Sequence, residues 1–243
     1  MIQDLHSHTY YSFCGKDRPE AVIEAAIRGG IEVLGFTDHS YGIGMSRPET
    51  LSNPNRAADF QRGLNAYVDH MLLLKEKYAG EIVIKCGIEI ATENAPHLIM
   101  PRGMDLSRFD FCLIESIGSR ATVCCDLFAF ADECGCPAVG LAHTDLVTYI
   151  TERKHNVFDY FCRMAERGIF WEMNVSYDSI HNYREHQYVK DFFDSEFLQD
   201  MVRRSGMRLS VGFDGHRVED YLPDRVADAC LRISGMNIPL AFE

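Results

Sequence analysis

The residues best suited to chemistry in this chain are histidines and carboxylates that follow short apolar segments. His6 and His8 close the first of these segments, and their spacing of two places both side chains on one face of an extended strand. Imidazole and carboxylate groups suit zinc, manganese or iron, and a mixed set with open coordination positions suits catalysis. Seven side chains are candidate ligands on this basis: His6, His8, His39, Glu89, His143, Asp214 and His216.

A divalent ion held by such a set can polarise a phosphate ester and activate water. It lowers the pKa of bound water from about 15.7 towards about 7, and two ions roughly 3.5–4 Å apart can hold both the attacking and the leaving oxygen. Glu89 is a natural bridge, because each carboxylate oxygen can bind a different ion. A lone histidine such as His143 is more often a hydrogen-bonded core residue. The whole set is stronger evidence, because burying it without cations would leave polar groups unpaired.

Short β-rich segments that alternate with longer helical patterns must position these residues. Strands are predicted at 2–6, 33–37, 82–88, 109–114, 138–142, 169–175 and 209–213. Most are continuous apolar runs, which is typical of parallel strands covered on both faces. Helices are predicted near 54–79, 122–134, 155–167, 186–205 and 223–234, and another between an N-cap at Asp17 and a stop at Gly29-Gly30.

About seven strand–helix units predict an α/β fold with right-handed crossovers and a closed or nearly closed parallel barrel. An open doubly wound sheet is the alternative, but no glycine-rich phosphate loop follows the first strand. No linker, charge block or repeat divides residues 1–243, which indicates a single domain. The carboxyl ends of barrel strands open on one face, so the candidate ligands are expected to converge there.

The composition, the net charge and the cysteine content indicate where such a barrel would be found in the cell and which partners it would avoid. The 243 residues are 47% hydrophobic and 25% charged, which is ordinary for a globular protein, and the formal net charge of −12 disfavours broad contact with nucleic acid. No apolar run approaches the roughly 20 residues of a membrane-spanning helix, and no signal peptide is visible. Nine cysteines, most beside apolar segments, indicate reduced thiols rather than disulfides. These features predict a cytoplasmic protein.

Five motifs follow one another in a specific order along the chain. They are His6-Ser7-His8, Asp38-His39, Gly87-Ile88-Glu89, Ala142-His143 and Gly212-Phe213-Asp214-Gly215-His216. This ordered set resembles the signature of the PHP (polymerase and histidinol phosphatase) family over residues 5 to about 220. The resemblance implies a distorted seven-stranded (β/α)7 TIM-like barrel and a metal-dependent hydrolase with two or three divalent ions, zinc, manganese or iron.

The resemblance also implies a role for each candidate ligand. By position, a first ion would be held by His6, His8, Glu89 and Asp214, a second by Glu89 and His143, and a third by His39 and His216. A metal-bound water or hydroxide would be the nucleophile, so the ligands would form most of the catalytic machinery.

Two positions depart from the pattern of the family. Many members carry a histidine after the fourth strand as a further ligand of the second ion, where this chain has Gly118; His97 or Glu115 could take its place. Cys14 stands where some relatives use histidine or aspartate for the third ion. A thiolate there would favour zinc or iron over magnesium, and a small residue in a Cys-Gly turn is the alternative.

Positively charged residues near the motifs are candidates to hold a phosphate group. Arg217 directly follows a candidate ligand, and Lys16 follows the first strand; arginine can donate two hydrogen bonds to phosphate oxygens. Their alternative role is that of solvated surface residues. His186 follows the sixth strand, where a leaving-group acid could sit, although an exposed loop histidine is the simpler interpretation.

The implied function is a metal-dependent phosphoesterase, specifically a phosphomonoesterase acting on a small phosphorylated metabolite such as histidinol phosphate. A nuclease or phosphodiesterase is one alternative, because PHP modules also occur with DNA polymerases. The acidic balance and the lack of a basic stripe with interleaved aromatic residues count against it. A metal-binding module without turnover is the other alternative, and the largely complete ligand set counts against that one.

Overall fold

The computed structural model describes residues 1–43, 56–90, 105–117, 126–176 and 186–243. All seven predicted strands are confirmed within these ranges. They are β1 (Gln3–Asp4), β2 (Val33–Phe36), β3 (Val83–Ile90), β4 (Phe111–Ile114), β5 (Val139–Leu141), β6 (Phe170–Asn174) and β7 (Leu209–Gly212). Most of their side chains are apolar and buried, as expected of parallel strands that are covered on both faces. The strand β1 is an exception, because Gln3 and Asp4 are buried polar residues.

The strands lie in chain order from β1 to β7, and every neighbouring pair is parallel. Backbone hydrogen bonds also join the first strand region to the last: Leu5 N–H donates to the Val211 carbonyl at 2.8 Å, and Asp214 N–H donates to the His6 carbonyl at 2.7 Å. These bonds bring the two edges of the sheet together. The predicted seven-stranded α/β barrel is therefore confirmed, and the open doubly wound sheet is excluded.

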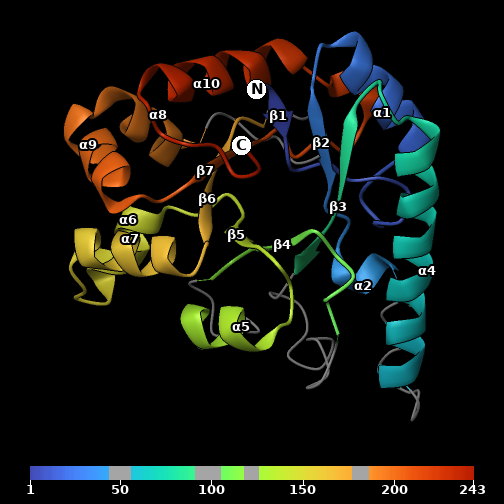
Figure 1. The fold of residues 1–243 in the computed structure, drawn as a ribbon, viewed down its shortest axis with the longest axis horizontal. Helices are drawn as coiled ribbons and strands as arrows, with labels where there is room; N and C mark the ends of the chain where they lie inside the picture. The colour runs from blue at the N-terminus through green and yellow to red at the C-terminus, as the bar shows by residue number, and fades with distance from the viewer. Residues whose placement is uncertain (44–55, 91–104, 118–125, 177–185) are drawn as a thin grey trace.

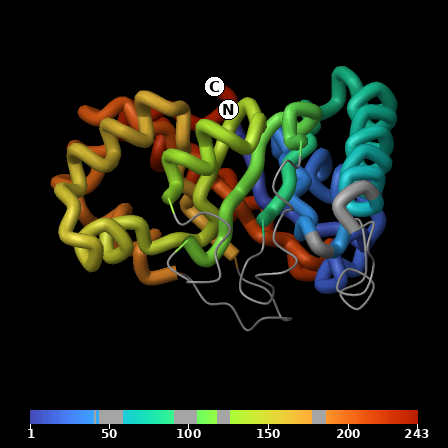
Figure 2. Tube along the Cα trace, turned by 90° about the horizontal axis from the view of Figure 1, so that it is seen from below, coloured from blue at the N-terminus to red at the C-terminus, as the bar shows by residue number. Residues whose placement is uncertain are grey.

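Helices alternate with the strands and surround them on the outside (Figure 1). The helices are α1 (Pro19–Arg28), α2 (Ser40–Ile43), α4 (Arg56–Lys77), α5 (Leu127–Glu133), α6 (Leu146–Glu152), α7 (Val157–Glu166), α8 (Gln187–Asp194), α9 (Glu196–Ser205) and α10 (Pro223–Gly235). Both termini lie at the amino ends of the strands, close to one another (Figure 2). In the described part of the chain, no helix has both the length and the apolar character needed to cross a membrane.

Three details of the predicted helices are corrected by the structure. The segment 186–205 forms two helices, because Ser195 is extended and its hydroxyl caps α9 by accepting from Leu198 N–H at 3.2 Å. The short helix α6 was not predicted. Asp17 is not the N-cap of α1: that position belongs to Arg18, and Asp17 instead accepts from Val218 N–H at 2.8 Å, which ties the start of α1 to the segment after β7.

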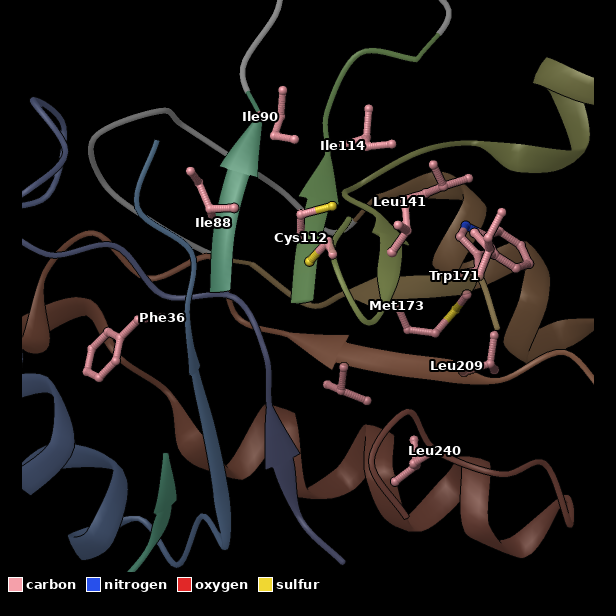
Figure 3. Packing of buried hydrophobic residues seen from close by; sticks show 14 of the residues in the cluster. Phe36, Ile88, Ile90, Cys112, Ile114, Leu141, Trp171, Met173, Leu209 and Leu240 are labelled. Atoms are coloured by element: carbon pink, nitrogen blue, oxygen red, sulfur yellow. The ribbon is translucent and has the colours of Figure 1, made fainter. Parts of the chain in front are cut away.

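Alternate residues of β4 pack into two separate hydrophobic regions. Phe111 and Leu113 of β4 belong to a cluster that includes Phe170 of β6, whereas Cys112 and Ile114 belong to the larger cluster between strands and helices. Figure 3 shows part of the larger cluster, with Cys112 and Ile114 among the labelled side chains. This period of two is the geometry of a strand with one face inside the barrel and the other under helices.

Aromatic rings fill the barrel interior next to two glycines. A Cβ atom at Gly87 would lie 2.5 Å from the ring of Phe111, and one at Gly140 would lie 2.2 Å from the ring of Phe170. Glu89 lies two residues beyond Gly87 on β3, so it faces the same interior but closer to the carboxyl end of the strand. The barrel interior is thus apolar towards its amino end and polar towards its carboxyl end.

Candidate metal centre

The structure brings the seven candidate ligands together at the carboxyl ends of the strands. His6 and His8 follow β1, His39 follows β2, Glu89 lies near the end of β3, His143 follows β5, and Asp214 and His216 follow β7. Six of these residues have low solvent exposure as whole residues, at 9% or less, and the side chain of His143 is 19% exposed. These side chains therefore lie on one face of the barrel, as predicted.

Four of the side chains meet at one point. The Nε2 atoms of His6 and His8 lie 3.1 Å apart. Glu89 Oε2 is 3.4 and 3.3 Å from these two atoms, and Asp214 Oδ1 is 3.4 and 3.2 Å from them. Two imidazoles and two carboxylates that converge in this way form a mixed nitrogen and oxygen donor set, which fits zinc, manganese or iron.

Glu89 also contacts two further histidines, His39 and His143. Its Oε2 atom lies 3.1 Å from Nδ1 of His39, and its Oε1 atom lies 3.2 Å from Nε2 of His143. Glu115, one of the two residues considered as a substitute for the missing histidine, has its Oε2 atom 3.8 Å from Nε2 of His143. One ligand atom each from His39, Glu89 and Glu115 also lie within 4.8 Å of one another. His97 and Gly118 lie outside the described residues.

The buried carboxylates of the cluster raise the pKa values of neighbouring histidines and so favour positive charge at the site. Burial by itself lowers the pKa of His8, but hydrogen bonds to Asp214 and Glu89 outweigh it and raise the pKa to about 9. The pKa of His143 also rises to about 9, because its interaction with Glu89 overcomes the effect of burial. Histidines retain protons here because the buried carboxylates need a counter-charge, which divalent cations could equally supply.

The pKa values of the acidic side chains in the cluster shift in two directions. Burial raises the pKa of Glu89, but the neighbouring His6 and His39 outweigh burial and hold the pKa well below its usual range. Burial, followed by repulsion from Glu89, raises the pKa of Glu115 to about 8. Burial and repulsion from Glu89 and Asp214 also raise the pKa of the Cys14 thiol to about 12. Without cations, burial and the neighbouring carboxylates therefore favour the protonated forms of Glu115 and Cys14.

A buried carboxylate and an amide hold the candidate ligands in place. Nδ1 of His6 donates to Glu172 Oε1 at 2.7 Å, and the backbone N–H of His143 donates to Glu172 Oε2 at 2.6 Å. Asn174 donates from Nδ2 to Glu172 Oε2 at 3.2 Å and to Asp214 Oδ2 at 3.5 Å. Such partners fix the orientation of imidazole and carboxylate ligands, and these bonds give that role to Glu172 and Asn174.

Sequence reasoning missed the role of Asp38 and the turn that it fixes. Asp38 accepts hydrogen bonds from the backbone N–H groups of Thr9 and Ser12 at 2.7 and 3.1 Å, and from both of their hydroxyl groups. Ser12 Oγ in turn accepts from His39 N–H at 2.8 Å and lies 3.2 Å from Nδ1 of His8. The Asp38-His39 motif is the signal in the sequence for this role, because it places a carboxylate directly before a candidate ligand.

Backbone strain coincides with two of the candidate ligands. His143 has φ of 27° and Asp214 has φ of 58°, a region that residues other than glycine rarely adopt. Such conformations persist where the surrounding structure holds them, and they concentrate at functional sites.

The two cationic candidates for phosphate binding are tied to other partners. Arg217 donates from Nη1 to Glu219 at 3.1 Å, and Lys16 donates from Nζ to the Phe13 carbonyl at 3.4 Å. Neither bond connects them to the histidines, so their role in substrate binding stays a prediction. His186 is not an exposed loop residue as expected: it is half-buried, and its ring lies parallel to that of His143 with centroids 6.1 Å apart.

The fold and the side-chain cluster define a class of protein, a parallel α/β barrel with buried potential metal ligands at its carboxyl end. The chain belongs to the PHP domain family, whose sequence pattern matches residues 4–230. The family predicted from the ordered motifs is therefore confirmed.

Two solved structures share this fold at low sequence identity. One is histidinol phosphate phosphatase from Lactococcus lactis subsp. lactis Il1403, complexed with zinc, L-histidinol and phosphate; it is 17% identical, with a TM-score of 0.63 over 98% of this chain and 95% of that one. The other is a candidate histidinol phosphatase from Listeria monocytogenes, 14% identical, with a TM-score of 0.52 over 90% of this chain and 96% of that one. No curated protein matches the chain in sequence.

Proposed function

We propose that the chain is a metal-dependent phosphomonoesterase that hydrolyses a small phosphorylated metabolite. The position of Glu89 carries this proposal. Its two oxygens lie 3.1 to 3.4 Å from ring nitrogens of four histidines: His6, His8, His39 and His143. A buried carboxylate between several imidazoles is suited to bridge two cations, and paired cations suit the displacement of an oxygen from phosphorus.

We assign the ligands by this geometry together with the family pattern. A first ion is assigned to His6, His8, Glu89 and Asp214, a second to Glu89, His143 and Glu115, and a third to His39 and His216. Glu115 is included because its carboxylate lies beside His143 and within the same group of potential ligand atoms as Glu89. The Glu115 carboxylate would supply an oxygen ligand in place of the histidine that many family members carry where this chain has Gly118.

Each part of the site then has a definite task. Divalent ions bound here would polarise the ester and lower the pKa of a nearby water. Glu172 holds His6 by its Nδ1 atom, so that Nε2 faces Glu89 and Asp214. Asn174 holds Glu172 and Asp214 relative to one another. These bonds fix the donor atoms before substrate arrives, which reduces the reorganisation that the reaction would require.

The substrate class is inferred from the pocket beside the cluster and from the net charge of the chain. A pocket of about 290 Å³ next to His143 is lined in part by Asp145, Tyr149 and Arg153, a size that suits a small metabolite. The net charge of −12 disfavours a polyanion such as nucleic acid. The similar barrel from Lactococcus lactis was solved with zinc, L-histidinol and phosphate, which makes zinc and histidinol phosphate the first metal and compound to test.

Phosphate release from a panel of phosphomonoesters, histidinol phosphate included, would test the proposal. Wild-type protein loaded with zinc, manganese or iron would be compared with Asp214→Asn and with Asp159→Asn. Asp159 is an exposed carboxylate on α7 and serves as a matched control. We expect turnover in the wild type and in Asp159→Asn, and a loss of turnover in Asp214→Asn.

Two results would contradict the proposal in different ways. Hydrolysis of phosphodiesters without hydrolysis of monoesters would favour the alternative of a phosphodiesterase or nuclease. Stoichiometric metal binding with no hydrolysis of either class, for all three metals, would favour a metal-binding module. In both cases the ligand assignment could still be tested by measuring metal content.

A further inference from the structure

A second group of potential ligands lies beside Glu89 and contains a thiol. One ligand atom each from His8, Cys14, His39 and His216 lies within 4.8 Å of the other three, and all four residues are buried. His8 and His216 stack with ring centroids 4.4 Å apart, and His8 and His39 lie with centroids 4.6 Å apart. Three imidazoles and one thiol form the kind of donor set that zinc binds in proteins.

The surroundings of Cys14 differ from those of the other buried cysteines. Within the described residues, the buried thiols in the hydrophobic core are Cys86, Cys112, Cys134, Cys136 and Cys230. Cys14 is also buried, at 5% exposure, but it belongs to neither hydrophobic cluster and lies among histidines instead. A small core residue would be expected to pack with apolar side chains, so packing does not account for a cysteine at this position.

The segment that carries Cys14 is fixed on both sides. Before it, the N–H and hydroxyl groups of Ser12 donate to Asp38 at 3.1 and 2.7 Å. After it, the backbone N–H of Lys16 donates to the carbonyl of His216 at 3.0 Å. The second bond joins the loop that carries Cys14 directly to a residue of the same ligand group. The thiol is therefore held near the imidazoles by hydrogen bonds at both ends of a short loop.

We propose that Cys14 binds, as a thiolate, the metal ion that His39 and His216 hold, and that this position selects zinc over magnesium and manganese. The inference rests on the proposed function, because it assumes that the cluster binds divalent ions. Thiolate is a soft ligand and favours zinc, whereas carboxylate and water suit magnesium and manganese. Binding breaks the S–H bond, forms a sulfur–metal bond and releases the proton to solvent. His8 stays with the first ion, so the fourth position is left open.

Cobalt(II) provides the test, because a thiolate bound to cobalt gives a charge-transfer band in the near ultraviolet. The metal-free full chain would be titrated with cobalt, and total bound cobalt would be measured in parallel. We expect the band in the wild type and its loss in Cys14→Ser. Cys230→Ser is the matched control: Cys230 is fully buried, it bonds only to the Gln3 backbone in the described structure, and its replacement should leave the band intact.

Zinc affinity gives a second readout from the same proteins. We expect Cys14→Ser to bind one zinc ion about 10–100-fold more weakly than wild type, while the remaining ions keep their affinity. If Cys14→Ser does not fold, zinc-edge X-ray absorption on the wild type replaces it. That spectrum should contain a sulfur neighbour at about 2.3 Å from zinc.

The outcomes separate this inference from the proposed function. A wild-type protein that binds cobalt stoichiometrically without the band, or a band that persists in Cys14→Ser, would overturn the role of Cys14 alone. Only nitrogen and oxygen neighbours in the zinc spectrum would do the same. A chain that binds no cobalt and no zinc would instead overturn the proposed metal-dependent function itself.

Discussion

Glu172 accepts a hydrogen bond from Nδ1 of His6 at 2.7 Å, and both side chains are completely buried. The bond fixes the ring so that its other nitrogen, Nε2, lies 3.4 Å from both Glu89 and Asp214. The second oxygen of Glu172 accepts the backbone N–H of His143 at 2.6 Å. One carboxylate thus sets the orientation of the His6 imidazole and fixes the backbone of His143, a second potential ligand that follows β5.

We predict that Glu172→Gln weakens metal binding while the fold is retained. The carboxylate accepts hydrogen bonds through both oxygens, and a glutamine amide nitrogen would face a donor on one side. We expect zinc affinity and turnover to fall by about 10–100-fold. Competition with a chelating dye measures the affinity, and Glu166→Gln, an exposed site on α7, is the control. Unchanged zinc affinity in Glu172→Gln would contradict the positioning role.

We predict that Gly212→Ala disrupts the cluster by crowding. A Cβ atom at this position would lie 2.1 Å from Glu172 Oε1 and 2.6 Å from Cβ of His6. Both groups are buried, so we expect a loss of about 1–3 kcal/mol of unfolding free energy together with weaker zinc binding. In contrast, no atom lies within 4 Å of a Cβ at Gly235 in α10, and Gly235→Ala should stabilise by about 0.5 kcal/mol. Urea unfolding measures both variants, and equal effects would be evidence against the crowding argument.

We predict that the metal-free protein loses stability as the pH rises from about 6.5 to about 9. The folded-state pKa values of His8 and His143 are about 9, above the ordinary value of 6.5. Their stabilising contribution is therefore fully present below pH 6.5 and disappears as the pH passes through 9, at about 1.4 kcal/mol for each pKa unit. Urea midpoints across this range, with and without zinc, measure the effect. Zinc should remove the decline, because it replaces the protons; a flat profile for the metal-free protein would refute the prediction.

We predict that Glu115→Gln lowers the number of ions bound by the chain. The carboxylate lies 3.8 Å from His143 and belongs to a group of potential ligands with His39 and Glu89. An amide is a weaker ligand for a divalent ion, so we expect one ion fewer per chain at the same free zinc concentration. Elemental analysis after dialysis against buffered zinc measures the content, with Asp159→Asn as the control. Equal metal content in the wild type and in Glu115→Gln would remove Glu115 from the second ion.

Local patterns in the sequence were enough to predict the barrel. Most of its strands are continuous apolar runs separated by helical segments, and this pattern does not depend on distant contacts. The end of α8 could not be predicted in this way, because the apolar periodicity continues across Ser195 into α9. Asp17 was assigned to the wrong role for a related reason: its partner, Val218, lies 201 residues away in the chain.

The candidate ligands were predictable because each ends a strand, and strand ends in a parallel barrel meet on one face. Their supporting contacts were harder to foresee. Asp38 acts through Thr9 and Ser12, which belong to a loop rather than to a periodic element. The position of His186 beside His143 likewise depends on how the segment after β6 returns to the barrel. Such contacts are tertiary, and spacing along the chain does not encode them.

The rings of Phe111 and Phe170 pack against Gly87 and Gly140 and fill the barrel interior towards the amino ends of the strands. Because these rings fill that end of the interior in the described part of the chain, a substrate would enter and its products would leave at the carboxyl ends. Released phosphate would occupy the route that the next ester needs. Phosphate released there would lie beside the candidate ligands that also hold the ester, so we expect added inorganic phosphate to raise the KM for the ester and to leave kcat unchanged.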